Sequence, residues 1–220
     1  TIHRREQYEK LIADFEQRRV DVLVGTQMIA KGLDFPHVSF VGMIHTDSEG
    51  FSADFRAHER LFQLVTQVAG RAGRASAAGE VVIQTLMPEL PALTFALTHD
   101  YPAFATHELT MRARIGFPPF RRLARFIVSH TRDEQARQES EILASGVRAA
   151  VVAVGANHAD LLGPTHAPMP RLRGQYRYDL LLRTATASDL RLVLDRLRSD
   201  RALRVKSAQL TIEVDPVSLA

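Results

Sequence analysis

The stretch Gln67-Val-Ala-Gly-Arg-Ala-Gly-Arg74 is the most informative part of this sequence. Arg71 and Arg74 are three residues apart, so on a helix their guanidinium groups lie on one face, about one turn from each other. Gly70 and Gly73 lie beside them, although each glycine costs ~1 kcal/mol in a helix interior relative to alanine. This combination indicates a helix surface where the missing glycine side chains let a phosphate-sized anion approach the backbone closely. A frayed helix end with solvated arginines is the alternative that these residues alone leave open.

A second stretch, Val24-Gly-Thr-Gln-Met-Ile-Ala-Lys-Gly-Leu-Asp-Phe-Pro36, begins where a buried strand is predicted to end. Parallel α/β sheets bind their ligands at this end of their strands. The stretch offers backbone and hydroxyl groups for phosphates, a cation and a carboxylate, at Gly25, Thr26, Gln27, Lys31 and Asp34. The alternative is an ordinary crossover with a lone solvated lysine. A spacing of about 35 residues from this stretch to the arginine-rich one, with one strand between, argues against a chance combination of the two.

Strands and helices alternate around these two stretches. Short apolar runs at 21–25, 38–45 and 81–85 predict buried strands, while apolar spacing predicts one helix around 8–15 and another at 57–72. Strands that are apolar throughout and alternate with helices indicate a parallel sheet with helices on both faces. We therefore expect an α/β domain over residues 1–100.

The pattern changes after a connecting helix expected at 102–115, which Gly116-Phe-Pro-Pro119 ends. We expect a connecting region at 101–118 and a small α+β domain over 119–220. Its elements are predicted in the order strand, helix, strand, strand, helix, strand, at 123–130, 134–151, 160–163, 176–183, 188–198 and 210–214. This βαββαβ order is the ferredoxin-like arrangement.

Two local features of the second domain carry further expectations. Ser188 is the expected N-cap of the helix at 188–198, whose buried face would hold Leu190, Leu194 and Leu197. The stretch from Pro164 to Gly174 is expected to be a long, proline-rich loop with a function of its own.

Composition excludes several classes of protein. Apolar residues make up 45% of the chain and charged residues 24%, which is typical of globular proteins. The chain has no cysteine, which excludes disulfides and thiolate zinc sites, and its 9 histidines show no metal-ligand spacing, so we assign no metal site. No apolar run approaches the ~18 residues of a membrane span, and we expect a cytoplasmic protein without membrane contact. Because it opens at Thr1 without an initiator Met, we expect a fragment of a longer protein.

Together these stretches resemble the primosomal protein N′ family of superfamily 2 DNA helicases. Val24–Pro36 is similar to helicase motif V, and Gln67–Arg74 to motif VI. The strings Asp54-Phe-Arg-Ala-His-Glu-Arg60, Gly116-Phe-Pro-Pro-Phe120 and Pro170-Arg-Leu-Arg-Gly-Gln-Tyr-Arg-Tyr178 are similar to more particular parts of that family. The resemblance implies an incomplete RecA-like helicase lobe 2 followed by a DNA- or partner-binding domain.

The resemblance also implies an activity. The full-length protein would be an ATP-dependent 3′–5′ DNA helicase that restarts stalled replication forks and initiates primosome assembly. In that family, ATP with Mg²⁺ lies between two lobes, and motif VI reaches across as an arginine finger. The implied roles are catalysis for Arg71 and Arg74, nucleotide binding for Gln67, Gly70, Gly32 and Asp34, and DNA binding for Thr26, Gln27 and Lys31; whether Lys31 faces DNA or nucleotide stays open.

Several parts of such an enzyme are missing from this sequence. It contains no Gly-x-x-x-x-Gly-Lys-[Ser/Thr] loop to bind the phosphates and no Asp-Glu pair to hold Mg²⁺. The resemblance places both on lobe 1, upstream of this chain, together with a cysteine-rich segment where zinc is expected. We therefore predict that the chain alone hydrolyses no ATP.

Two stretches without acidic residues, 109–132 and 161–178, carry arginines interleaved with aromatic residues. Arginines and aromatics together suit phosphates and unpaired bases, although Phe120 and Phe126 are more readily explained as core. Arg171, Arg173 and Arg177 are the expected docking residues. The resemblance implies forked, single-stranded and duplex DNA, the acidic tail of single-stranded DNA-binding protein and other primosome proteins as partners. The alternative reading of the whole chain is a non-catalytic DNA- or protein-tail-binding module derived from a helicase lobe.

Overall fold

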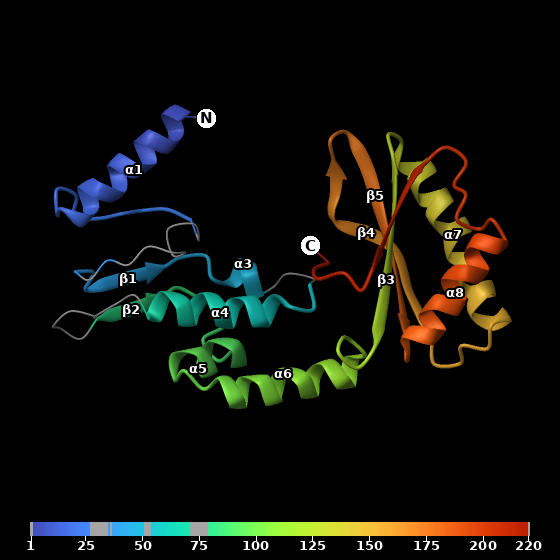
Figure 1. Cartoon of the computed structure of the whole chain (residues 1–220), viewed down its shortest axis with the longest axis horizontal. Helices are drawn as coiled ribbons and strands as arrows, with labels where there is room; N and C mark the ends of the chain where they lie inside the picture. The colour runs from blue at the N-terminus through green and yellow to red at the C-terminus, as the bar shows by residue number, and fades with distance from the viewer. Residues whose placement is uncertain (1, 27–34, 36, 51–53, 71–78, 220) are drawn as a thin grey trace. The chain divides into compact units, whose positions relative to one another are not determined.

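The computed structural model describes residues 2–26, 35, 37–50, 54–70 and 79–219 (Figure 1). By its contacts the chain divides into two compact units. Unit 1 comprises Thr1–Phe51 and Ala57–Ala105, and unit 2 comprises Ser52–Arg56 and Thr106–Ala220. The short stretch from 52 to 56 therefore belongs to unit 2, although the chain on either side of it belongs to unit 1.

Unit 1 contains a parallel pair of strands, β1 (Phe40–Met43) and β2 (Glu80–Ile83). The predicted strands at 38–45 and 81–85 are thus confirmed with shorter bounds, and so is their parallel direction. The prediction that they are buried is wrong, since the residues of both strands alternate between exposed and half-buried. Around them lie α1 (Ile2–Glu16), α3 (Asp47–Gly50), α4 (Ala57–Ala69) and α5 (Pro91–Leu97).

The predicted strand at 21–25 is wrong. Residues 21–26 have no regular secondary structure, and Val22 and Val24 are 72% and 82% exposed. An apolar run forms a buried strand only where a neighbouring strand accepts its hydrogen bonds, and in the described chain none lies beside this one.

The core of unit 1 forms between α4, α5 and the start of α6 (Tyr101–Ile115). Leu61, Phe62 and Val65 recur on one face of α4 and are at most 4% exposed. They pack with buried residues of α5 and with Phe104, whose ring stacks on Phe62 at 4.3 Å between centroids. This apolar face fixes how α4 lies in unit 1.

Helix α6 confirms the connecting helix predicted at 102–115. It ends where Gly116 takes φ +73°, a left-handed conformation that glycine adopts without a steric penalty. The Phe117 N–H then donates to the Arg112 carbonyl at 2.9 Å, which closes the helix end in the manner of a Schellman motif.

Unit 2 is a four-stranded sheet with two helices. Its elements are β3 (Arg122–His130), α7 (Asp133–Ala153), β4 (Asp160–Leu172), β5 (Gln175–Thr184), α8 (Ala187–Ser199) and β6 (Gln209–Val214), in the predicted order. The strands lie in the order β4-β5-β3-β6, and each neighbouring pair is antiparallel. Figure 1 shows α7 and α8 on the same side of this sheet.

The main core lies between this sheet and its two helices. Alternate residues of β3, Ala124, Phe126 and Val128, face the helices and are fully buried. The expected buried face of α8 is confirmed by Leu190, Leu194 and Leu197, with Val193 between them.

The N-cap of α8 is Thr186, so the prediction of Ser188 is wrong. The Thr186 hydroxyl accepts from the Asp189 N–H at 3.1 Å and donates to the Asp189 carboxylate at 2.8 Å. This reciprocal pairing satisfies a free N–H of the first turn, which a hydroxyl already inside the helix does less well.

The prediction of a long loop at 164–174 is also wrong. Strand β4 continues to Leu172 and pairs with β5 to form a hairpin. Its register shifts between Leu162 and Thr165, and again between His166 and Arg171. All three prolines of the stretch fall within these shifts, where a residue without an N–H costs no ladder hydrogen bond. The hairpin closes through Arg173 and Gly174, both at positive φ, as a two-residue turn requires.

Candidate functional site

The arginine-rich stretch begins on the last turn of α4. Gln67 is half-buried there, and Gly70 is exposed directly after the last helical residue. Thr26 is exposed at the end of a described segment. The other residues predicted for the nucleotide and DNA sites lie outside the described residues; they are Gln27, Lys31, Gly32, Asp34, Arg71 and Arg74.

Packing against the described residues does not account for the glycine at position 70. A Cβ there would lie 3.4 Å from the Thr66 carbonyl oxygen and 3.7 Å from that of Gln67, which are ordinary van der Waals distances. The backbone at this residue also lacks a positive φ that would demand glycine. Among the described residues, neither a close contact nor the backbone conformation explains the missing side chain at this position.

The three predicted docking arginines belong to one hairpin but not to one face. Arg171 pairs with Tyr176 across the hairpin, and its guanidinium lies 5.1 Å from the centre of the Tyr176 ring. Arg177 follows Tyr176 in β5, so its side chain points to the opposite face of the strand. Arg173 is exposed at the turn. The positive charge is therefore distributed around the hairpin end rather than over one flat patch.

Most arginines of the stretch 109–132 are paired with acidic residues from other parts of unit 2. Arg112 is buried and donates to Glu108 at 2.9 Å. Arg122 lies 3.2 Å from Asp215. The absence of acidic residues within the stretch therefore did not indicate a continuous basic surface. Of its phenylalanines, Phe126 is buried as expected, whereas Phe120 is 49% exposed.

A buried ion pair lies on the sheet face opposite α7 and α8. The side chain of Arg125 is only 5% exposed and donates to Asp179 Oδ2 from Nε at 2.9 Å and from NH2 at 2.5 Å. Glu213 lies 3.5 Å from the same guanidinium. Burial raises the pKa of Asp179 despite the opposing effect of Arg125, and its Oδ1 atom has no hydrogen-bond partner. This pair shapes the sheet and is not available to a ligand.

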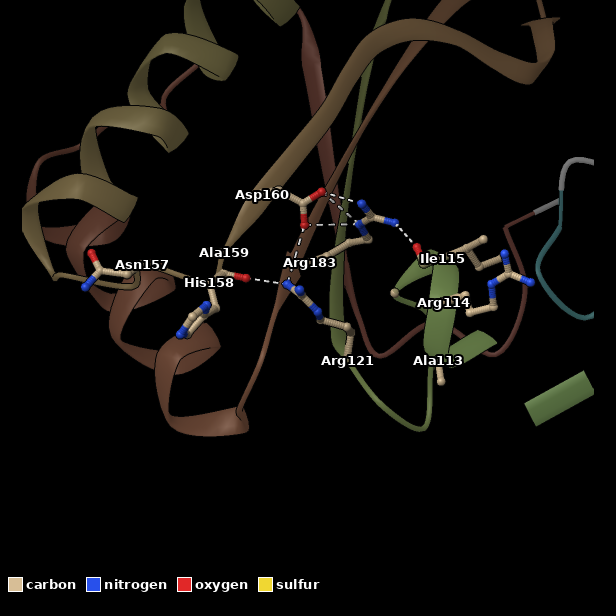
Figure 2. A pocket seen from close by; sticks show the side chains of 10 residues that line it. Ala113, Arg114, Ile115, Arg121, Asn157, His158, Ala159, Asp160 and Arg183 are labelled. Atoms are coloured by element: carbon tan, nitrogen blue, oxygen red, sulfur yellow. Dashed lines mark hydrogen bonds and ion pairs between the residues drawn. The ribbon is translucent and has the colours of Figure 1, made fainter. Parts of the chain in front are cut away.

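A pocket of about 360 Å³ lies where the end of α6 meets β4 and β5 (Figure 2). In Figure 2 the Asp160 carboxylate lies between Arg183 and Arg121; Arg183 donates to it at 3.1 Å, and Arg121 lies 3.7 Å away. Arg183 also donates to the Ile115 carbonyl at 2.5 Å. Arg114 adds a third cation, so the lining side chains carry three positive charges against one negative, a net +2 with His158 neutral. Such a pocket suits a phosphate or carboxylate group.

Sequence reasoning missed this pocket because its charged residues are far apart along the chain. Arg114 and Arg121 belong to the stretch 109–132, which lacks acidic residues, but no local pattern marks Asp160 and Arg183. Only the adjacency of β4 and β5 brings them together. In the described part of the chain no cluster of three potential metal ligands is found, and no helix there combines the length and apolar character of a membrane span.

Comparison with protein families defines the class of protein. Residues 3–76 match the helicase conserved C-terminal domain, and residues 113–217 match the primosomal protein N C-terminal domain. Along the chain, a match to the helicase conserved C-terminal domain is thus followed by a match to the primosomal protein N C-terminal domain, and the two matches together cover most of its length.

The relatives identify the particular protein that the chain resembles, replication restart protein PriA. The Bacillus subtilis protein of that name is 37% identical over 98% of this chain, and the Haemophilus influenzae protein is 37% identical over 99%. The Synechocystis protein is 34% identical over the whole chain. The chain spans 27%, 29% and 26% of these relatives. Among solved structures, the de novo designed protein Foldit4 covers 43% of the chain at 16% identity and a TM-score of 0.30, a likeness that carries no argument.

Proposed function

We propose that this chain is the C-terminal part of a cytoplasmic, ATP-dependent 3′–5′ DNA helicase that restarts stalled replication forks and initiates primosome assembly. The observation that carries the proposal is the order of the two family matches along one chain, together with 33–37% identity to the replication restart proteins over nearly all of its length. The functional unit would include a further lobe with the P-loop and the Asp-Glu pair. The chain would contribute one side of the nucleotide site, part of the DNA track and a docking domain.

In this proposal Arg71 and Arg74 reach the γ-phosphate of ATP·Mg²⁺ held by lobe 1, and stabilise the charge of the transition state. Gln67 and Gly70 lie at the end of α4 next to them in the chain. An exposed glycine that neither its described neighbours nor its backbone conformation requires supports the close approach of a second lobe at this point. Gly32 and Asp34 would lie towards the nucleotide.

Thr26, Gln27 and Lys31 would contact the DNA backbone, and unit 2 would bind further DNA or a protein tail. We propose that its four-stranded sheet and two helices form a ferredoxin-like domain; the element order and the strand order β4-β5-β3-β6 support this. Following the sequence, we place a RecA-like lobe at 1–100, a connection at 101–118 and the docking domain at 119–220.

Arg171, Arg173 and Arg177 would receive phosphates of forked, single-stranded or duplex DNA, or the carboxylates of the acidic tail of single-stranded DNA-binding protein. Their distribution around the end of a hairpin suits a ligand that wraps this end more than one that lies flat on a sheet. The pocket beside Asp160 offers a second place for one anionic group. Other primosome proteins would assemble on the longer protein, and zinc would bind only in its cysteine-rich segment.

The test is ATP hydrolysis by this chain mixed with separately produced lobe 1, with and without forked DNA. The chain alone should hydrolyse no ATP, and the mixture should be active. Arg74→Ala should lower turnover by about 10³-fold, because an arginine finger acts on the transition state. Arg74→Lys should recover little, since an ammonium lacks the guanidinium fork.

The control is Arg198→Ala on α8, whose side chain is 70% exposed and far along the chain from the proposed nucleotide site. Equal turnover for Arg74→Ala and the unmodified chain would contradict the arginine-finger role. A mixture that binds forked DNA but hydrolyses no ATP would instead favour the non-catalytic binding module.

A further inference from the structure

The string Asp54-Phe-Arg56 has no role in the proposed nucleotide or DNA site, yet its residues are held tightly within unit 2. Asp54 is 4% exposed. Its Oδ2 atom accepts from the Leu219 N–H at 3.0 Å and from the Ser218 hydroxyl, and its Oδ1 accepts from the Arg56 N–H at 2.9 Å. One buried carboxylate therefore joins two segments more than 160 positions apart along the chain. We call residues 54–56 the anchor and residues 217–219 the terminal clamp.

The other two residues of the anchor make independent contacts with unit 2. The Phe55 ring is stacked on Phe117, with ring centres 5.5 Å apart and planes at 7°. The Arg112 guanidinium, itself fixed by Glu108, lies 5.3 Å from the centre of the Phe55 ring. Such aromatic and cation–π contacts hold a ring in one orientation as well as burying it.

The terminal clamp closes over the anchor from the end of the chain. Arg56 NH1 donates to the Val217 carbonyl at 3.5 Å, and Leu219 is only 8% exposed. All three anchor residues are thus fixed by side chains or backbone of unit 2. Such a dense set of contacts is unusual for a connecting segment, since most loops lie exposed on the surface.

The anchor is followed by α4 without a spacer. Ala57 is the first residue of the helix, and its last turn carries Gln67 and precedes Arg71. An α-helix rises about 1.5 Å per residue, so α4 extends about 20 Å from the anchor to its last residue, Ala69, within the arginine-rich stretch. With an apolar face buried in unit 1, α4 is a stiff element, and a displacement at its first residue reaches its last turn.

We propose that the anchor and terminal clamp couple unit 2 to the nucleotide site through α4, and that Asp54 and Ser218 are positioning residues for ATP hydrolysis. This rests on the proposed helicase function. Because the proposed arginine finger acts in the transition state, loosening the clamp should lower kcat and leave the KM for ATP unchanged. A contact that only stabilised unit 2 would lower its resistance to unfolding without changing kcat of the folded enzyme.

The test compares Ser218→Ala, which removes the hydroxyl donor, with Ser218→Thr, which keeps it. In the full-length helicase with saturating forked DNA, Ser218→Ala should lower kcat about three- to tenfold at unchanged KM, and Ser218→Thr should restore it. In the 220-residue chain, which needs no ATP, Ser218→Ala should accelerate amide hydrogen exchange along 57–69 by a similar factor, because opening of α4 becomes easier. Exchange along α7 is the internal control.

Asp54→Asn is a second, stronger variant, since it replaces a charged carboxylate that accepts three hydrogen bonds. Unchanged exchange in α4 for both Ser218→Ala and Asp54→Asn would overturn the proposal, as would faster exchange without any change of kcat. If the unmodified full-length protein hydrolyses no ATP, the helicase function fails separately, while faster exchange in α4 would still support the coupling.

Discussion

Replacing Arg125 with methionine should strongly destabilise unit 2. Methionine keeps most of the side-chain volume but removes the guanidinium that pairs with Asp179. The Arg125 side chain is 5% exposed and that of Asp179 is 16% exposed, so the abandoned carboxylate cannot regain full hydration. Breaking such a buried pair costs about 3–5 kcal/mol. Because Glu213 is 40% exposed and can turn to water, we expect a loss near the lower limit, about 3 kcal/mol.

A double-mutant cycle separates the pair from its surroundings. Asp179→Leu alone leaves Arg125 with Glu213 as a partner and should cost less than Arg125→Met. The double variant Arg125→Met/Asp179→Leu should lie within about 1 kcal/mol of the unmodified protein, because a well-packed apolar pair can replace a buried ion pair. The assay is urea denaturation followed by circular dichroism, since the chain has no tryptophan. Hydrogen exchange of the β3 and β5 amides assigns the loss to unit 2.

The pH dependence of Arg125→Met gives a second reading of the same pair. Burial already raises the pKa of Asp179, and loss of the guanidinium should raise it further. A carboxyl with a raised pKa in the folded state binds its proton more readily there than in the unfolded chain, so the variant should gain stability as the pH falls from 7 towards 5. A cost below about 1 kcal/mol, or equal costs for the single and double variants, would refute the reasoning that this pair is buried and coupled.

Two further predictions concern unit 1 and the hairpin. Hydrogen bonds from the Thr85 hydroxyl, at 2.6 Å, and from the Leu86 N–H hold the pKa of Asp47 below 3.8, so their contribution to stability should be lost as the pH falls below that value. In thermal unfolding between about pH 2.5 and 6, the melting temperature of Asp47→Asn should therefore fall less steeply with decreasing pH than that of the unmodified chain. Parallel curves for the two proteins would contradict this. Arg173→Glu at the hairpin turn should weaken the binding of DNA or of an acidic tail peptide, which fluorescence anisotropy over a salt series measures. The control is Arg191→Glu on α8, where the arginine side chain is 83% exposed, and this variant should bind both ligands normally. If both ligands bind Arg173→Glu normally, the turn is not a docking site.

Most secondary structure of this chain follows from local patterns. The apolar spacing of α8 predicted its buried leucines, and the end of α6 was expected from the string Gly116-Phe-Pro-Pro119. The strands of unit 2 were predicted to within one or two residues, with β4 as the exception. The sequence of β4 predicts a loop because of its prolines, and only the pairing with β5 reveals that each proline lies at a register shift.

The resemblance to the primosomal protein N family was also evident from the sequence, because the motifs that carry it are short continuous strings at characteristic spacings. Tertiary structure alone decided which charges face one another. Arg125 meets Asp179, and Arg183 meets Asp160, because β5 lies between β3 and β4 in the sheet. It likewise decided that the last residues of the chain close over Asp54. The physical reason is that a local sequence pattern determines the backbone conformation and the exposure of the residues within it. The contact between two charged residues far apart along the chain is determined only when the strand order brings their segments together.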